Sequence, residues 1–238
     1  MPDSITAAAL EVPHRFGHPR EQLAWIAAHL PAAELVVLPE AALTGYVSSR
    51  GNFDLAPQAE ARGGESERAL RDLARSRKTA LVAPLIEREG NRCYNSALFI
   101  DEAGAVLARY RKRHPWIPET WATPGRNAAP LIQWRGLTLT IAICFDINFI
   151  LEDAARELML CDALLFPSAW TEEEDSRPQL LPEVARATGC MVLNANWGEG
   201  SPRVPGQGGS MIVSGEGAIV ARGATCRALL SARGQGAR

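Results

Sequence analysis

The chain has 238 residues, of which 47% are apolar, so it is long enough to bury a substantial core in one large domain. Its 25 basic and 27 acidic residues give a formal net charge of -2. Because this balance leaves no basic surplus to hold a phosphate backbone, we expect no nucleic acid partner.

The N-terminal residues lack the charged-then-apolar order of a signal peptide, and no apolar run approaches the roughly 18 residues that span a bilayer. We therefore expect a cytoplasmic protein without a membrane partner. The five cysteines are an odd number, are widely spaced and form no C-x-x-C pair. With only four histidines beside them, they predict reduced thiols and no metal site. We interpret four of them as small buried apolar residues: Cys93, Cys161, Cys190 and Cys226.

Short apolar runs alternate with amphipathic stretches along the chain, which is the rhythm of an α/β protein. In chain order we expect a helix over 21–30, a strand over 35–38, a helix over 65–78, a strand over 79–83, a strand over 137–143, a helix near 151–160 and a strand over 163–166. Pro19 is a start signal for the first helix.

Two segments, 96–109 and 210–222, each place a Gly-containing turn between apolar strands and therefore read as hairpins. Similar hairpins in corresponding places suggest two sheets related by an internal pseudo-symmetry. No linker divides the chain, so we expect a single domain over residues 1–230. Residues 231–238 are rich in Gly and Arg and are expected to form a flexible tail.

Three reactive side chains follow the C-terminal ends of predicted strands: Glu40, Lys112 and Cys144. In open α/β sheets, ligands bind at this edge, because strand ends deliver side chains to a common crevice. Taken alone, Lys112 belongs to a charge cluster that is usually solvated, and a lone glutamate usually lies on the surface. Their joint placement favours a catalytic interpretation.

A cysteine attacks an amide as the thiolate, so it needs a base and a cation nearby. Glu40 is the candidate base. As the thiolate adds to a carbonyl group, negative charge develops on the oxygen, and Lys112 and the backbone amide of Phe145 are the candidate stabilisers. A carboxyl group of raised pKa at Glu40 would then protonate the leaving amine and activate the water that releases the acyl group.

Five strings in order resemble the signature blocks of the nitrilase, or carbon-nitrogen hydrolase, superfamily: LVVLPEAALTGY, RYRKRHPW, IAICFD, ALLFPSAW and MVLNANWGEG. The resemblance covers nearly the whole chain. It implies a four-layer αββα sandwich, no cofactor, frequent assembly into homodimers, and a catalytic triad that falls on Glu40, Lys112 and Cys144. It also implies that Glu119 orients the lysine, although an exposed loop acid is the alternative for this residue. The string PWIPE resembles the aliphatic amidase branch.

The sequence departs from many superfamily members after the nucleophile, where Asn148 replaces an arginine and a proline is missing. The start of the following helix is therefore in doubt. We expect Phe145, Trp116, Trp170 and Asn148 around the substrate, with core packing as the alternative for the tryptophans.

We expect hydrolysis of a small carboxamide to a carboxylate and ammonia through a thioester. Nitrilases typically have Trp and Glu after the cysteine, whereas this chain has Phe145 and Asp146. N-carbamoyl amino acid hydrolysis needs a cation for the substrate carboxylate, and no Arg or Lys lies between Cys144 and Arg156. Arg177, Arg186 or Arg203 would have to supply it from other loops. A catalytically silent scaffold is the alternative outside enzymes.

Overall fold

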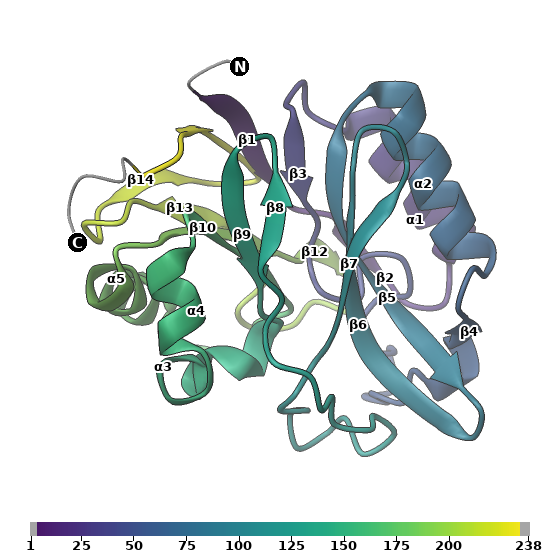
Figure 1. Cartoon of the computed structure of the whole chain (residues 1–238). Coiled ribbons are helices and arrows are strands. Elements are labelled where there is room, and N and C mark those ends of the chain that lie inside the picture. The colour runs from purple at the N-terminus through teal and green to yellow at the C-terminus, as the bar shows by residue number, and fades with distance from the viewer. Residues whose placement is uncertain (1–3, 234–238) are drawn as a thin grey trace.

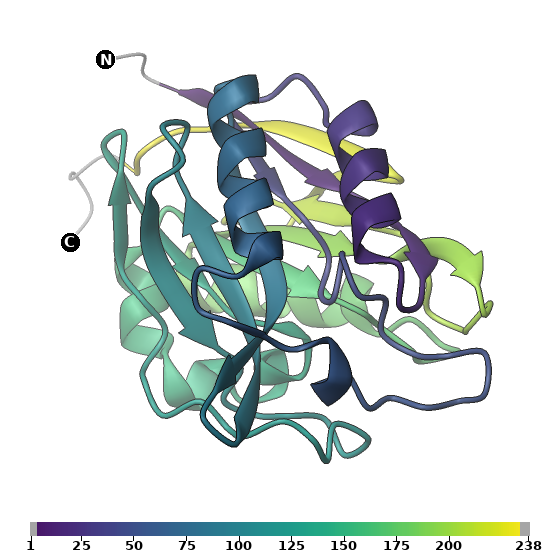
Figure 2. The same ribbon diagram turned by 90° about the vertical axis from the view of Figure 1, so that its right-hand side faces the viewer.

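The computed structural model describes residues 4–233 and contains two β-sheets that pack face to face (Figure 1). Helices α1 (Pro19–His29) and α2 (Glu65–Arg77) cover the outer side of the first sheet. Helices α3 (Ile150–Asp153), α4 (Ala155–Leu160) and α5 (Arg177–Thr188) lie outside the second sheet. The turned view separates α1 and α2 from the sheets behind them (Figure 2). The expected four-layer αββα sandwich is confirmed.

The strands are best described sheet by sheet, in spatial order. The first sheet contains β15 (Thr225–Leu230), β1 (Ile5–Leu10), β3 (Leu35–Val37), β5 (Ala80–Glu89), β6 (Arg92–Ile100) and β7 (Val106–Arg111), and β4 (Glu60–Ala61) also pairs with β5. The second sheet contains β14 (Ile219–Arg222), β13 (Met211–Val213), β11 (Met191–Asn196), β10 (Ala163–Ser168), β9 (Leu137–Ile141) and β8 (Ile132–Trp134). A small separate pair joins β2 (Pro13–Arg15) to β12 (Gly198–Ser201). Short 3-10 helices are η1 (Ala56–Gln58) and η2 (Cys144–Asn148).

The two sheets repeat the same topology. In the first sheet the parallel strands β1, β3 and β5 are followed by the antiparallel hairpin β6–β7. In the second sheet the parallel strands β9, β10 and β11 are followed by the antiparallel hairpin β13–β14. The two predicted hairpins therefore occupy equivalent positions, and the expected pseudo-symmetry is confirmed.

Strand β3 is apolar at every position because both of its faces are buried. Leu35 and Val37 pack in the core between the two sheets, whereas Val36 packs in a second core with residues of α1 and α2, such as Ile26 and Leu70. A parallel strand that is covered on both faces has no solvent side, so it shows no polar alternation.

The segment after the nucleophile differs from the expected single helix. Helices α3 and α4 are separated at Ala154, which has φ -146° and ψ 21°. Helix α5 was not among the predicted elements, and its sequence contains Pro178 and Pro182. Pro178 lies in the first turn, where its missing N–H costs nothing, but Pro182 lies inside the helix.

The structure describes only residues 231–233 of the expected C-terminal tail. Residues 234–238 lie outside the described residues, so the flexibility of the tail stays a prediction. At its described end, the guanidinium group of Arg233 donates hydrogen bonds to the carbonyl groups of Leu158 and Thr188. Within residues 4–233, we find no helix that has both the length and the apolar character needed to cross a bilayer.

Candidate active site

Three loops at one edge of the sandwich bring Glu40, Lys112 and Cys144 together. Glu40 follows β3, Lys112 follows β7 and Cys144 follows β9. Strand β7 runs in the same direction as β3, because two antiparallel steps separate β7 from β5. All three side chains are buried, with exposures of 1%, 1% and 7% for Glu40, Lys112 and Cys144.

A buried cluster of two carboxylates surrounds the ammonium group of Lys112. The Lys112 Nζ atom lies 2.7 Å from Glu40 Oε1 and 2.9 Å from Glu119 Oε2. Glu119 is 2% exposed, so it is not the surface loop acid that was the alternative. A buried cation is tolerated only when anions and hydrogen bonds compensate its lost hydration, and this pair of carboxylates does so.

Asn95 joins the two carboxylates from the side of the first sheet. Its Nδ2 group donates to Glu40 Oε1 at 2.7 Å and to Glu119 Oε1 at 2.8 Å. Asn95 was not predicted from the sequence. A signal was present, because asparagine is depleted in strands, yet Asn95 lies within β6, in which every residue after Arg92 is buried.

Backbone amides fix the remaining carboxylate oxygens. The amide of Ala169, after β10, donates to Glu40 Oε2 at 3.0 Å. The amide of Trp116 donates to Glu119 Oε2 at 2.7 Å. Each carboxylate is therefore held at both oxygens, which leaves little rotational freedom for Glu40.

Cys144 occupies a sharp turn between β9 and η2. Its φ of 45° lies in the left-handed region, which is uncommon for a residue with a Cβ atom. Holding a non-glycine residue there costs on the order of 1–3 kcal/mol, and surrounding contacts must offset that cost.

Asp146 supplies such contacts and ties the nucleophile turn to the segment after Lys112. Its Oδ2 atom accepts hydrogen bonds from Tyr110 Oη at 2.8 Å and the Ile143 amide at 3.1 Å. Its Oδ1 atom accepts from the amides of Arg113 at 3.1 Å and His114 at 2.8 Å. The sequence analysis noted Asp146 but did not predict this role.

Burial sets the resting protonation of the cluster of Glu40, Lys112 and Cys144. It raises the pKa of the Cys144 thiol well above its usual value, and the charge of Glu40 adds to this effect while Lys112 opposes it. Burial also raises the pKa of Glu40, against the opposing charge of Lys112. The pKa of Lys112 is itself raised, because the charges of Glu40 and Glu119 outweigh its burial. The resting sulfur is therefore a thiol, and Glu40 has an increased proton affinity.

A small cavity of about 70 Å³ opens beside Cys144. The sequence-predicted residues Phe145, Trp116, Trp170 and Asn148 all line it. The sequence analysis did not predict its other wall residues, which are Tyr46, Ala169, Thr171 and Glu172.

Tyr46 faces the cavity with a buried polar group. Among the described residues its hydroxyl has no hydrogen-bond partner, and it lies close to Glu119 without the geometry of a hydrogen bond. Burial, followed by the charge of Glu40, raises the pKa of Tyr46 well above its usual value. The Tyr46 hydroxyl is therefore neutral and keeps its O–H proton as a potential hydrogen-bond donor.

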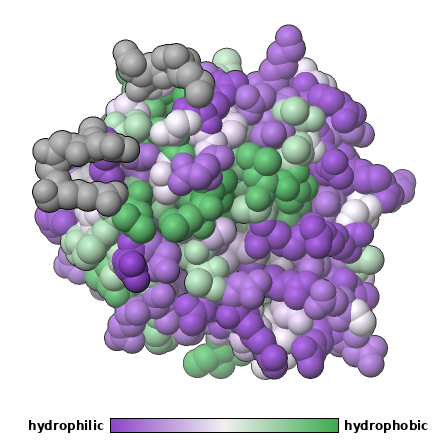
Figure 3. Space-filling view, in the orientation of Figure 1, coloured by the Kyte–Doolittle hydropathy of each residue, from purple (hydrophilic) through white to green (hydrophobic). Residues whose placement is uncertain are grey.

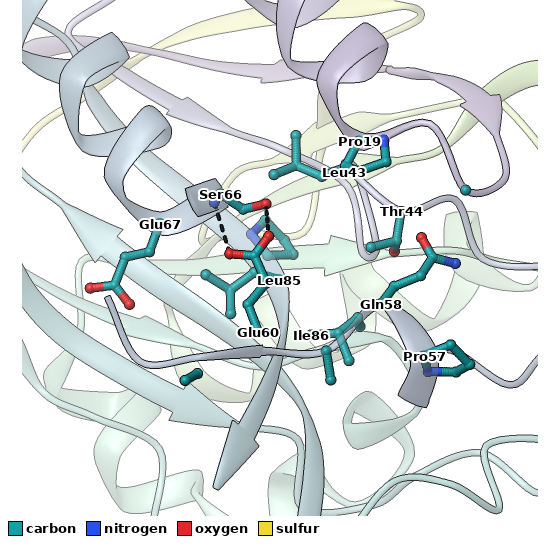
Figure 4. Close-up of a pocket in the computed structure, with 14 residues that line it drawn as sticks. Pro19, Leu43, Thr44, Pro57, Gln58, Glu60, Ser66, Glu67, Leu85 and Ile86 are labelled. Carbon is teal, nitrogen blue, oxygen red and sulfur yellow. Dashed lines mark hydrogen bonds between the residues drawn. The ribbon is translucent and has the colours of Figure 1, made fainter. Parts of the chain in front are cut away.

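A larger hollow of about 300 Å³ lies elsewhere, between η1, α2 and β5 (Figure 4). It contains none of the triad residues. Its two acidic side chains already have partners: Glu60 accepts hydrogen bonds from Ser66, and Glu67 accepts them from Gly63 and Arg109. The hollow next to Cys144 is consequently the candidate active site.

The three arginines that the sequence left as possible partners of a substrate carboxylate do not line the cavity. Arg177 is buried and donates to Asp175 at 2.8 Å and to Asn194 at 3.1 Å. Arg186 donates to a backbone carbonyl group and Arg203 pairs with Glu199.

Comparisons with known proteins agree with this geometry. The carbon-nitrogen hydrolase family model matches residues 7–229. A mutant of the Nesterenkonia AN1 amidase from the nitrilase superfamily superimposes with a TM-score of 0.85 at 28% identity, covering 97% of this chain and 92% of that one. A Bradyrhizobium diazoefficiens formamidase is 29% identical over an alignment of 248 positions, which covers 96% of this chain and 67% of the formamidase.

An (R)-stereoselective amidase from a Pseudomonas species is 33% identical over 125 residues, which cover 52% of this chain and 43% of the amidase. The chain spans about half the length of several curated relatives. The family model nevertheless matches nearly every described residue, and the fold agrees with it over the same length. The chain therefore belongs to the carbon-nitrogen hydrolase family.

Proposed function

We propose that this protein hydrolyses small carboxamides to a carboxylate and ammonia through a thioester on Cys144. One observation carries the proposal: a buried thiol lies beside Glu40, whose carboxylate contacts the Lys112 ammonium group at 2.7 Å, at the wall of a small cavity. Base, cation and nucleophile are the three groups that attack on an amide requires.

In the first half-reaction the Cys144 thiol transfers its proton to Glu40 as sulfur attacks the amide carbon. The carbonyl π electrons move to oxygen, and the Lys112 ammonium group and the Phe145 amide stabilise the oxyanion. The C–N bond then breaks as Glu40 returns the proton to nitrogen, which leaves as ammonia. The raised pKa of Glu40 suits this exchange, because a base and acid in turn must hold and release one proton near neutral pH.

In the second half-reaction water enters the place left by ammonia. Glu40 removes a proton from the water, whose oxygen attacks the thioester carbon. Collapse of the tetrahedral intermediate releases the carboxylic acid, and the thiolate regains its proton from Glu40. Lys112 stays protonated throughout, as its raised pKa supports.

The size of the cavity and the solved relatives favour small amides. A volume of about 70 Å³ is far below the roughly 300–1,000 Å³ of pockets for drug-sized ligands. One mutant of the Nesterenkonia amidase has been solved in complex with butyramide, and another with the acetamide moiety of fluoroacetamide added to its active-site cysteine.

An ammonia-release screen tests the proposal. Formamide, acetamide and butyramide should be hydrolysed faster than an N-carbamoyl amino acid or a nitrile. A clear preference for the N-carbamoyl compound or the nitrile would replace carboxamide hydrolysis with that activity.

The catalytically silent alternative requires a separate test. Intact-mass spectrometry after incubation with fluoroacetamide should show one adduct, mapped to Cys144 by peptide analysis. The other four cysteines are buried and do not line the cavity, so they serve as internal controls. The absence of both a selective adduct at Cys144 and ammonia release from fluoroacetamide would support a silent scaffold.

A further inference from the structure

This inference rests on the proposed amide hydrolysis and concerns the charge of the substrate. The carboxylate of Glu172 lies at the cavity beside Cys144. Its Oε2 atom accepts hydrogen bonds from Trp170 Nε1 at 3.0 Å and from Ser176 Oγ. Among the described residues, no hydrogen bond reaches its Oε1 atom. The carboxylate is thus anchored through one oxygen and open at the other.

The negative charge of Glu172 is not neutralised by an ion pair among the described residues; the nearby Arg177 guanidinium, 6.0 Å from the Trp170 ring, pairs with Asp175 instead. Asp175, three residues later, pairs with Arg177 at 2.8 Å and Arg222 at 3.1 Å. Glu172 forms no ion pair with any residue between 4 and 233. Among the described residues that line the cavity, Glu172 alone belongs to the Asp, Glu, Lys and Arg types that are charged at neutral pH.

The rest of the wall is suited to a cation. Four aromatic side chains line it, and aromatic faces attract ammonium groups through their quadrupoles. These residues are Tyr46, Trp116, Phe145 and Trp170. A substrate carboxylate would have to leave water without a cationic partner and close to Glu172, which is unfavourable.

We propose that Glu172 is a specificity-determining residue that selects amides bearing an ammonium group on the acyl chain and rejects amides bearing a carboxylate. The ammonium group would lie among the aromatic walls and donate to the open oxygen of Glu172. The carboxamide would lie at Cys144, so the selection acts at the end of the substrate away from the broken bond.

Three amides of similar size test this inference: butyramide, 3-aminopropanamide and malonamate. Measured kcat/KM of the wild type should follow the order 3-aminopropanamide, butyramide, malonamate. Glu172→Gln keeps the hydrogen-bond acceptor but removes the charge. It should lower the ratio of kcat/KM for 3-aminopropanamide to that for butyramide by about two- to fivefold, the scale of one exposed charge pair.

Two controls separate this charge effect from a structural one. Glu173→Gln removes the neighbouring exposed charge, which does not line the cavity, and should leave the ratio unchanged. The wild-type preference for 3-aminopropanamide should also weaken at high salt, because ions screen a charge at an open rim.

Each remaining outcome is decisive. An unchanged ratio in Glu172→Gln, or an equal change in Glu173→Gln, overturns the role of Glu172 and leaves amide hydrolysis standing if butyramide is turned over. If the wild type releases ammonia from none of the three amides, the proposed function fails and this inference fails with it.

Discussion

A single buried ammonium group is shared between two carboxylates at the centre of the site. Lys112 contacts both Glu40 and Glu119, and Asn95 donates hydrogen bonds to the same two carboxylates. This sharing fixes the position of the ammonium group before a substrate arrives. A fixed cation stabilises an oxyanion without reorganising during the reaction, which is where much of the rate enhancement of such sites originates.

The base and the oxyanion stabiliser should differ in their kinetic effects. Glu40→Gln should lower both the alkylation rate of Cys144 and kcat, because it removes the proton acceptor. Lys112→Met should cost about 3 kcal/mol or more of transition-state stabilisation, which is more than a hundredfold in kcat/KM. Assays below the melting temperature of each variant, measured by circular dichroism, would check this. A full kcat in either variant is incompatible with the triad.

The pH dependence of turnover follows from the raised pKa of Glu40. The base must be ionised to accept the thiol proton, and burial moves its pKa above the ordinary value of 4.5. As pH falls, kcat/KM should therefore decline at a higher pH than an exposed glutamate would give. A pH profile with butyramide measures this limb. A decline centred at or below pH 4.5 would contradict a raised pKa at Glu40.

At this scale the sequence predicted the charged residues better than the neutral ones. Glu40, Lys112 and Cys144 were recognisable because strand ends meet at one sheet edge. Asn95 reaches Glu40 and Glu119 only because of the register of β6 on β5, and the position of Tyr46 depends on the path of the loop after β3. Local sequence patterns contain neither the register nor the path of the loop.

At the scale of elements, the loop that carries Glu40 and Tyr46 is held by a buried histidine of β2. His14 Nε2 accepts hydrogen bonds from the amides of Tyr46 at 3.1 Å and Val47 at 3.3 Å. Its Nδ1 group lies 3.0 Å from the carbonyl oxygen of Ser201, to which it donates in this tautomer. The neutral imidazole is therefore required, since a protonated ring has no acceptor for the two amides.

Stability should consequently depend on pH through His14. Burial lowers its pKa below the ordinary value of 6.5, against the raising effect of its hydrogen bond to Ser201. The unfolded chain then binds more protons than the folded one, so this contribution is complete above pH 6.5 and is lost as pH falls through the lower folded pKa.

The matched variant is His14→Gln, which cannot titrate. We expect the free energy of unfolding from urea titrations to fall between pH 7 and pH 5 by less in the variant than in the wild type, and to be lower at pH 7. Parallel pH slopes in the two proteins would rule out His14 as the source.

The elements themselves were predictable where apolar periodicity was strong. Helices α1 and α2 begin and end within two residues of the predicted ranges 21–30 and 65–78. The helix predicted near 151–160 is broken at Ala154, and α5 was missed. In both cases packing against the second sheet, rather than local propensity, determines where the helix lies.

At the scale of the whole molecule, one face carries a band of exposed apolar side chains. Figure 3 shows apolar side chains in a band over β7 and β8 and toward α4. Exposed large apolar residues on these elements include Leu107, Leu131 next to β8, Met159 and Leu160. Contiguous exposed apolar surface often marks a contact with another protein.

We propose that this band is the interface of a homodimer. Light scattering after size-exclusion chromatography should give the mass of two chains, and Met159→Glu should shift the protein toward the mass of one chain. Ile117→Glu is the matched control, because Ile117 is 85% exposed but lies on a loop outside the band. A monomeric wild type, or a dimer unaffected by Met159→Glu, would contradict the proposal.

The central claim is that Cys144 is the nucleophile of an amide hydrolase. Its most direct test is the rate of ammonia release from butyramide by Cys144→Ala beside that of Cys226→Ala, with melting temperatures measured for both. We predict no detectable release from Cys144→Ala at a melting temperature close to that of the wild type, and substantial release from Cys226→Ala. Release by a folded Cys144→Ala variant near the wild-type rate would contradict the account.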